Sequence, residues 1–300
     1  GREGRVFAEQ FWNGARTSPE MAERYPLTGL GLTGAIGAVV HTRGFYERLK
    51  ATNALPVVRL NLPYNPSFGK RTKEVGQSPP YSLAVFGHLG RNRRIEQILD
   101  ALAAFSRRDK FTLTIMGELW DRSHVSGLVE HLGLTGNVEI LGYVPEEELD
   151  SRLSRADLVL NLRYPTMGEA SGSQLRIWDH TLPSLVTNIG WYAELPAETV
   201  FWVDPDRERE DICRYLQMFL DDPEPFQRVG ENGRKHLLRD HSPQQYVEEL
   251  KEFLEGVSRW QGKFAYRYLA ARLAKCSEWF INDNNLFLLR NAAQKTDSLL

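Results

Sequence analysis

The sequence predicts an α/β protein whose main part is a doubly wound parallel sheet with helices on both faces. Three observations lead to this fold class. Six short apolar segments follow one another between residues 82 and 203, amphipathic helical patterns separate them, and the 300-residue chain has an ordinary globular composition, 42% hydrophobic and 25% charged. Apolar strands that alternate with amphipathic helices are typical of a parallel sheet covered on both faces.

The first eighty residues have a less regular pattern. Residues 1–34 have a helical tendency, and predicted strands at 35–40 and 56–62 flank a predicted helix at 44–52. The segment after them is polar and flanked by prolines, as linkers are. We therefore expect four parts: the end of one Rossmann-like domain (1–65), a linker (66–80), a second domain (81–258) and a helical tail (259–300).

The second domain contains the six predicted strands. They cover residues 82–86, 111–116, 138–143, 157–162, 184–188 and 199–203, and the helices between them cover 94–105, 124–132, 146–155 and 174–180. Three further helices follow, and Ser242-Pro243 supplies a cap and a first-turn proline for the third. Because such sheets bind ligands at the carboxyl ends of their strands, we expect functional residues in the loops that follow the strands.

Composition and charge limit the classes of function that the protein could have. A formal net charge of −2 gives no reason to expect binding to nucleic acid or to an anionic membrane. Cys213 and Cys276 are too few for a disulfide framework, and we find neither an apolar stretch long enough to span a membrane nor a signal peptide. We expect a cytoplasmic protein, with peripheral membrane association left open. The chain does not begin with methionine, which suggests a fragment of a longer product.

The loop over residues 86–94 concentrates three arginines and His88 where a predicted strand leads into a helix. Gly87 and Gly90 allow the backbone to approach a ligand closely, and guanidinium groups match phosphate oxygens. The loop is therefore either an anion-binding site or a solvated loop whose arginines face water.

A second polar, glycine-containing turn covers residues 162–174. Ser171 and Gln174 have the spacing of a capping box, so Gly172 and Ser173 would present free backbone N–H groups in the first turn of a helix, where phosphates commonly bind. Glu169 would lie beside this anion site. Because a carboxylate repels phosphate, Glu169 is better suited to binding sugar hydroxyls than to binding the phosphate itself. The alternative is an ordinary helix start with a capping serine.

These motifs resemble those of the glycosyltransferases of family 4, also called group 1, which have the GT-B fold. The resemblance covers residues 35–257, the end of the N-terminal domain and the whole C-terminal nucleotide-sugar-binding domain of that family. The segments that carry it are Phe86-Gly-His-Leu followed by Arg93, Met116-Gly, Leu141-Gly-Tyr-Val-Pro145, Ala156-Asp157 and residues 169–183.

The resemblance implies roles for residues of both loops. Arg93 and His88 stand at the positions of the lysine and the arginine that bind the donor diphosphate, next to Gly87. Gly172 and Ser173 match the backbone that cradles the phosphates. Glu169 matches the first of two glutamates in the family motif and would contact the transferred sugar, so Glu169 and Arg93 are the candidate catalytic residues.

The nucleoside part of the site departs from the family pattern. The resemblance implies that the backbone near Tyr143 and Val144 holds the base. The second glutamate of the motif, which binds the ribose, is missing: its position falls at Ile177, or at Arg176 if one residue is deleted. Asp179 would either bind the ribose instead or be solvated on the helix surface, and Arg176 would either add charge to the diphosphate or form a structural salt bridge.

Two further motifs receive structural interpretations. Residues 190–194 resemble the family's paired-glycine turn, with Trp191 in place of the second glycine, and we interpret Glu194 as structural. Asp204-Pro-Asp206 resembles a metal-binding motif of another glycosyltransferase fold, but its place after a late strand favours a turn that begins a helix. Neither this motif nor the spacing of the histidines implies a metal.

The resemblance implies transfer of a hexosyl group, with retention of configuration and without a metal, from a UDP- or GDP-linked donor that is a substrate rather than a cofactor. The acceptor (saccharide, lipid-linked or protein) and the oligomeric state stay open, and polysaccharide biosynthesis is an analogy. The alternatives are a non-catalytic nucleotide-sugar-binding module and another GT-B enzyme such as a sugar-nucleotide epimerase. The fragment alone would bind the donor without catalysing transfer if the acceptor half is missing.

Overall fold

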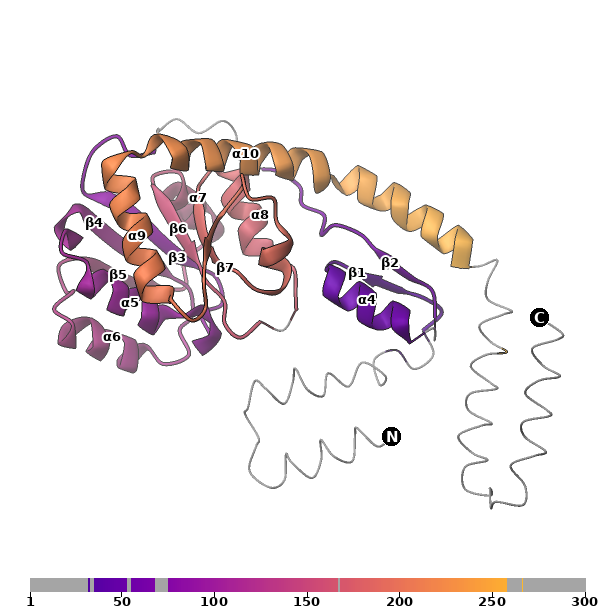
Figure 1. Cartoon of the computed structure of the whole chain (residues 1–300), viewed down its shortest axis with the longest axis horizontal. Coiled ribbons are helices and arrows are strands. Elements are labelled where there is room, and N and C mark those ends of the chain that lie inside the picture. The colour runs from indigo at the N-terminus through magenta and orange to yellow at the C-terminus, as the bar shows by residue number, and fades with distance from the viewer. Residues whose placement is uncertain are drawn as a thin grey trace, which may run out of the picture.

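The computed structural model describes residues 32, 35–52, 55–67, 75–166, 168–257 and 266 (Figure 1). Its first unit consists of β1 (Ala38–Val40), α4 (Arg43–Ala51) and β2 (Val57–Arg59), and the two strands pair in parallel. This is the strand, helix and strand order predicted for the first part of the chain. The predictions for residues 1–31, for residues 68–74 of the linker and for the tail with Cys276, apart from Tyr266, lie outside the described residues.

The second unit is a six-stranded parallel sheet in the order β5-β4-β3-β6-β7-β8, and each of the six predicted strands is present. The strands are β3 (Tyr81–Phe86), β4 (Phe111–Met116), β5 (Val138–Gly142), β6 (Leu158–Asn161), β7 (Ser184–Thr187) and β8 (Phe201–Val203). The helices are α5 (Ile95–Ala104), α6 (Arg122–His131), α7 (Glu146–Leu153), α8 (Gly172–Asp179), α9 (Glu208–Asp221) and α10 (Glu224–Asp240). The predicted α/β fold class is therefore confirmed.

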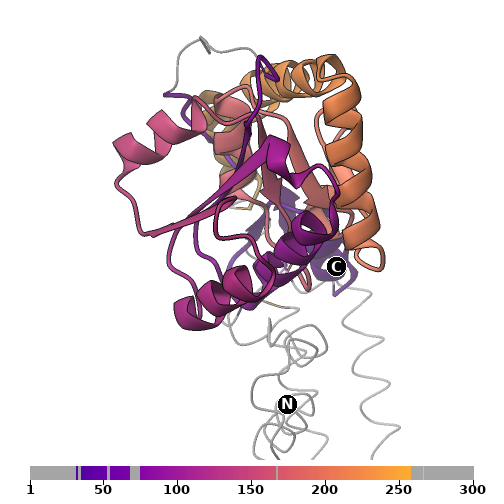
Figure 2. The same ribbon diagram turned by 90° about the vertical axis from the view of Figure 1, so that its left-hand side faces the viewer.

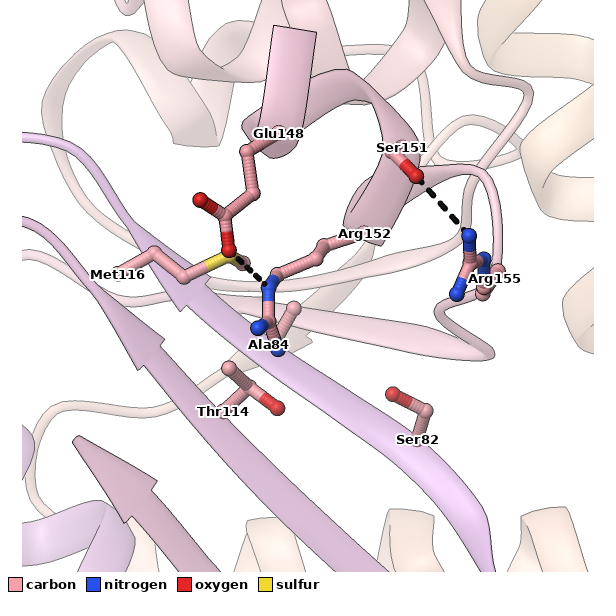
Figure 3. A pocket seen from close by; sticks show the side chains of 8 residues that line it. All are labelled: Ser82, Ala84, Thr114, Met116, Glu148, Ser151, Arg152 and Arg155. Atoms are coloured by element: carbon pink, nitrogen blue, oxygen red, sulfur yellow. Dashed lines mark hydrogen bonds and ion pairs between the residues drawn. The ribbon is translucent and has the colours of Figure 1, made fainter. Parts of the chain in front are cut away.

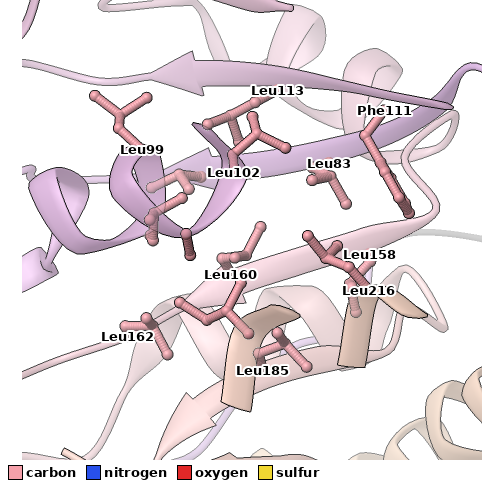
Figure 4. Packing of buried hydrophobic residues seen from close by; sticks show 14 of the residues in the cluster. Leu83, Leu99, Leu102, Phe111, Leu113, Leu158, Leu160, Leu162, Leu185 and Leu216 are labelled. Atoms are coloured by element: carbon pink, nitrogen blue, oxygen red, sulfur yellow. The ribbon is translucent and has the colours of Figure 1, made fainter. Parts of the chain in front are cut away.

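One face of the sheet carries the largest core. Helices α5, α6 and α9 cover it, and their leucines, isoleucines and aromatic rings pack on alternate residues of β3, β4 and β6, such as Leu83, Leu113 and Leu160 (Figure 4). Period-two alternation along each strand places these side chains on one face. The apolar stripes of the three helices bury themselves against it, as expected for amphipathic helices.

The opposite face is covered by α7 and α8, so helices flank the sheet on both sides (Figure 2). Helix α10 packs on α8 around the fully buried Trp178. Residues 243–257 form the predicted helix after Ser242, whose hydroxyl accepts the Gln245 N–H at 3.4 Å. This helix reaches the first unit, where Gly37 lies against Phe253 and Val257. No helix in the described ranges is long and apolar enough to cross a bilayer.

The entry to α5 differs from the prediction. Residues Arg91–Arg93 form the 3-10 helix η1, and Arg94 has a left-handed φ of 59°, so the α-helix begins one residue later, at Ile95. The Arg94 guanidinium forms an ion pair at 2.6 Å with the buried carboxylate of Glu208 at the start of α9. This tertiary contact holds Arg94 outside the helix and leaves Arg93 at the end of the preceding turn.

Candidate functional site

The order of the strands locates the crevice in which a ligand would bind. The chain runs outwards from β3 through β4 to β5, then returns to β6 on the other side of β3 and continues to β7 and β8. The connections therefore reverse direction between β3 and β6. In sheets of this kind the ligand crevice opens at the carboxyl ends of the two central strands. Both polar loops singled out in the sequence begin there, one after Phe86 and one after Asn161.

The loop after β3 brings glycine backbone against the start of α8. Gly87 has a φ of +107°, which side chains rarely allow, and a Cβ atom placed on it would lie 3.3 Å from the Ser173 hydroxyl. A Cβ atom on Gly117, after β4, would collide with the Gly87 carbonyl. Gly87 and Ser173, predicted from separate segments, therefore lie side by side. His88 is exposed at the rim of the loop.

Arg93 is buried in this crevice with an incomplete set of partners. Its side chain is 3% exposed, and Nη2 donates to the Phe86 carbonyl at 3.2 Å. Nε and Nη1 have no hydrogen-bond partner among the described residues, although the buried Tyr192 hydroxyl lies near. Burial lowers the pKa of Arg93, and the charge of Arg163 lowers it further, whereas Tyr192 and Glu169 favour the charged form. A buried guanidinium with two unused donors is able to bind an anion, and the predicted role of Arg93 at a diphosphate stays a prediction.

The loop after β6 contributes a second arginine that the sequence analysis did not select. Arg163 follows β6 by two residues, and its side chain is 17% exposed. Its Nη1 forms an ion pair with Glu169, while its Nε is buried without a partner in the described part of the chain. Thr166 Oγ1 lies 3.4 Å from the other oxygen of Glu169. The signal available in the sequence was an arginine directly after a buried strand with a glutamate in the same loop.

Helix α8 points its first turn at the same crevice. Its N-cap is Ser171, as predicted, and the Ser171 hydroxyl accepts the Gln174 N–H at 3.2 Å. Gly172 is exposed, and a Cβ atom placed on it would meet nothing within 4 Å. The first N–H groups of a helix have no partners within the helix and carry its positive dipole end. Gly172 and Ser173 thus present donors to the space beside Arg93.

The segment that should hold the ribose is built differently. Ile177, at the position of the missing second glutamate, is fully buried in the core beneath α7. Arg176 forms ion pairs with Glu146 at 2.5 Å and with Asp150 at 2.8 Å, both on α7. These contacts are those of a structural salt bridge, and a role for Arg176 at the diphosphate stays a prediction.

Asp179 is neither solvated nor open to the crevice. Its side chain is 1% exposed, it accepts the Ser67 N–H at 3.1 Å and it forms an ion pair with Arg234 of α10. Tyr64 Oη lies 3.5 Å from the same carboxylate. The expectation of a surface aspartate is therefore wrong, because residues 64–67 and α10 close over it. These contacts give no support to the ribose-binding role predicted for Asp179.

The predicted base-binding segment lies at the end of β5. Tyr143 is 81% exposed, whereas Val144 packs against the core beneath α7. A partly buried valine anchors the backbone of this turn, while the side chain of the neighbouring Tyr143 is exposed. The base-binding role of Tyr143 and Val144 stays a prediction.

The first unit lies against two loops of the site. The Glu194 carboxylate, at the end of η3 (Gly190–Glu194), accepts the Arg43 N–H at the start of α4 at 3.0 Å. A Cβ atom on Gly168 would lie 2.8 Å from the Phe45 ring of the same helix. The contacts of Glu194 agree with a structural role.

A separate cavity of about 320 Å³ lies beneath α7, against β3 and β4 (Figure 3). Arg152 and Arg155 line it together with the small polar side chains of Ser82 and Thr114. Arg152 pairs with Glu148 and Glu139, and Arg155 donates to Ser151. Within the described ranges no group of three His, Cys, Asp or Glu side chains is placed to hold a metal ion.

Comparisons with known proteins agree with this geometry. Residues 70–236, more than half of the chain, match the family model for glycosyl transferases group 1. No curated protein sequence matches significantly.

Three solved structures are similar in fold. They are sucrose-phosphate synthase from Thermosynechococcus elongatus (19% identity, TM-score 0.62, 82% of this chain and 65% of that chain), Anabaena Alr3699/HepE in complex with UDP and glucose (12%, 0.63, 79% and 65%) and a glycosyltransferase from Rickettsia africae (14%, 0.62, 73% and 62%). The chain spans less than two thirds of the length of each of them. At these identities the likeness establishes the GT-B type of fold. With its α/β sheet and the family match, the chain belongs to the glycosyl transferases group 1.

Proposed function

We propose that this chain supplies the donor-binding domain of a retaining, metal-independent glycosyltransferase of family 4, which moves a hexosyl group from a nucleotide sugar to an acceptor. The donor is a UDP- or GDP-linked sugar, and the acceptor would bind mainly to the other domain of the enzyme. The Anabaena neighbour in complex with UDP and glucose supports a uridine donor.

The observation that carries the proposal is the buried Arg93. Two of its guanidinium nitrogens have no partner among the described residues, and it lies at the crevice between β3 and β6. A diphosphate would supply the missing acceptors and the compensating charge, because charge-assisted hydrogen bonds to phosphate are among the strongest in proteins. The N–H groups of Gly172 and Ser173 would bind the same diphosphate from the start of α8.

The chemistry follows from where the charge develops. As the sugar leaves, negative charge accumulates on the diphosphate, and preorganised donors at that point lower the barrier. Arg93 and the α8 amides supply this stabilisation, Gly87 allows the diphosphate to approach the backbone, and His88 lies at the rim. Glu169 would contact the sugar hydroxyls. Retention requires that the acceptor enter on the face from which the diphosphate leaves.

A non-catalytic nucleotide-sugar-binding module is the second candidate. It is favoured by Ile177, a buried residue where the family has the glutamate for the ribose. Such a module would bind the donor through Arg93 but would transfer and hydrolyse nothing.

Calorimetric titration of the chain with nucleoside diphosphates and nucleotide sugars tests the proposal. We expect binding of one nucleotide, and Arg93→Ala should weaken it by about 1.5 to 3 kcal/mol, the cost of a lost charge-assisted hydrogen bond. Arg91→Ala is the matched control, because Arg91 is exposed in the same turn. Unchanged affinity in a folded Arg93→Ala variant would contradict the assignment of Arg93 to the diphosphate site. Sugar transfer or donor hydrolysis by the protein would distinguish the enzyme from the binding module.

A further inference from the structure

We propose that Arg163 is a second diphosphate-binding residue, which holds the sugar-side phosphate and exchanges its ion pair with Glu169 for that phosphate when the donor binds. The inference rests on the donor-binding function proposed above and deepens it. It assigns Arg163 and Glu169 to one switch that couples phosphate binding to sugar recognition.

The two loops of the crevice are joined beside both arginines. The backbone N–H of Tyr164, the residue after Arg163, donates to the carbonyl of Asn92, the residue before Arg93, at 2.8 Å. The backbone N–H of Arg163 itself donates to the Thr187 hydroxyl at the end of β7, at 2.9 Å. The backbone from which the Arg163 side chain starts is therefore fixed against the turn that carries Arg93.

The two side chains leave a positive charge unbalanced inside the crevice. Arg93 and Arg163 bring two guanidinium groups into a largely buried space, where Glu169 is paired with one of them. Three of their nitrogens, Nε and Nη1 of Arg93 and Nε of Arg163, have no partner among the described residues. Two neighbouring buried cations with unused donors are unfavourable unless an anion binds between them. A diphosphate has two phosphate groups, so one can bind each guanidinium.

The ion pair explains how a carboxylate tolerates an adjacent anion site. Without ligand, Arg163 neutralises Glu169. A phosphate that binds Arg163 competes with Glu169 for the same guanidinium, which frees the carboxylate to accept hydrogen bonds from hydroxyl groups of the sugar attached to that phosphate. The Glu169 carboxylate thus becomes available to the sugar hydroxyls only when the diphosphate has bound Arg163.

Titrations of the intact chain with UDP, UMP, GDP and GMP test the assignment. Wild type should bind the diphosphate of its base more tightly than the monophosphate. Arg163→Ala should weaken diphosphate binding about tenfold to a hundredfold, the range for a charged hydrogen bond, and change monophosphate binding less than about threefold. Arg163→Lys, which keeps the charge and loses the fork, should recover part of the loss. Equal diphosphate preference in wild type and Arg163→Ala would overturn the proposal.

The variant Glu169→Gln tests the switch itself. Because the amide no longer competes for Arg163, it should bind the nucleoside diphosphate several-fold more tightly, and this gain should vanish in the Arg163→Ala background. The same gain in affinity from Glu169→Gln with and without Arg163 would refute the proposed exchange of the ion pair for the phosphate. Circular dichroism melts of each variant show whether it is folded. Failure of the donor-binding function gives a different result, since folded wild type would then bind none of the four nucleotides.

Discussion

Two pairs of arginines lie against the same sheet, and their surroundings differ. Arg93 and Arg163 lie at the carboxyl ends of the central strands with three nitrogens that have no partner in the described ranges. Arg152 and Arg155 line the cavity beneath α7, where Arg152 donates to Glu148 at 3.0 Å and Arg155 donates to Ser151 at 3.1 Å (Figure 3). Arg152 also donates to Glu139 at 3.1 Å.

The difference shows which arginines are available to a ligand. Beneath α7, acceptors of the protein already pair with both arginines, and partly exposed ion pairs such as those of Arg152 contribute little to stability. The pair in the crevice costs stability in the free protein, because buried donors are left unused. A cavity lined by arginines is therefore weaker evidence for an anion site than a crevice whose arginines lack acceptors.

The largest expected effect comes from replacing Arg93 with an apolar residue of similar length. Arg93→Met should weaken nucleoside diphosphate binding by about 1.5 to 3 kcal/mol and leave the melting temperature of the free protein unchanged or raised, because it removes a buried charge that lacks full pairing. Arg152→Met should leave binding unchanged. Calorimetry and thermal melts of both variants measure the contrast. A marked loss of stability in Arg93→Met, with binding intact, would show that Arg93 stabilises the fold and does not bind the ligand.

The next effect concerns the backbone of the crevice. Gly87→Ala should lower stability by about 1 to 3 kcal/mol, the range for strained backbone, and weaken donor binding, since φ is +107° and the new methyl group would lie 3.3 Å from Ser173 Oγ. Gly136→Ala is the control, because nothing lies within 4 Å of its Cβ position and its φ is not in the left-handed range. Urea unfolding of both variants measures the two free energies of unfolding. Equal values would show that the turn at Gly87 accommodates a methyl group without strain.

The sequence predicted the sheet and its helices well because burial imposes a period on every strand and helix of this unit. It also predicted the cap at Ser171, since capping depends on residues only three apart. It misplaced the start of α5, because the conformation of Arg94 depends on Glu208, 114 residues away.

Long-range contacts also explain what was missed in the site. Asp179 is buried by Ser67 and Arg234, which are 112 and 55 residues away in the chain. Arg163 was passed over because the sequence does not tell which way the first side chains after a strand turn. The position of Arg163 beside Arg93 depends on how β6 pairs with β3, which no local pattern reports.

A paired arginine of α8 leads to a pH prediction. Burial raises the pKa of Asp150, but hydrogen bonds from Arg176 and His180 outweigh it and hold the pKa below its ordinary 3.8. Burial lowers the pKa of His180 below 6.5, against the opposing effect of Asp150. Both groups bind fewer protons in the folded state. Their contribution to stability is therefore complete above about pH 6.5 and is lost as the pH decreases, first that of His180 and then, below 3.8, that of Asp150.

The substitution Asp150→Asn tests the contribution of the Asp150 charge separately from that of His180. The variant should be less stable than wild type at pH 7, because Arg176 and His180 lose a charged acceptor. The difference should shrink as the pH falls below about 4, where the Asp150 carboxylate of the unfolded wild-type chain becomes protonated, and further as the pH passes the lower pKa of the folded state. Urea unfolding followed by circular dichroism across this range measures the difference, with the exposed Glu130→Gln as control. A difference that does not change with pH would show that Asp150 stabilises the helices without its charge.

The smallest effect is expected at the rim, where the side chain is not what binds. Tyr143 is 81% exposed, and the base is proposed to contact the backbone of this turn, so Tyr143→Ala should change stability by no more than about 0.5 kcal/mol, as for most surface substitutions. Donor affinity should change little for the same reason. Titration with the preferred nucleoside diphosphate and with its monophosphate provides the measurement. A large and equal loss for both ligands would mean that the Tyr143 ring stacks on the base, and nucleotide selectivity would then belong to an exposed aromatic ring rather than to the buried arginines.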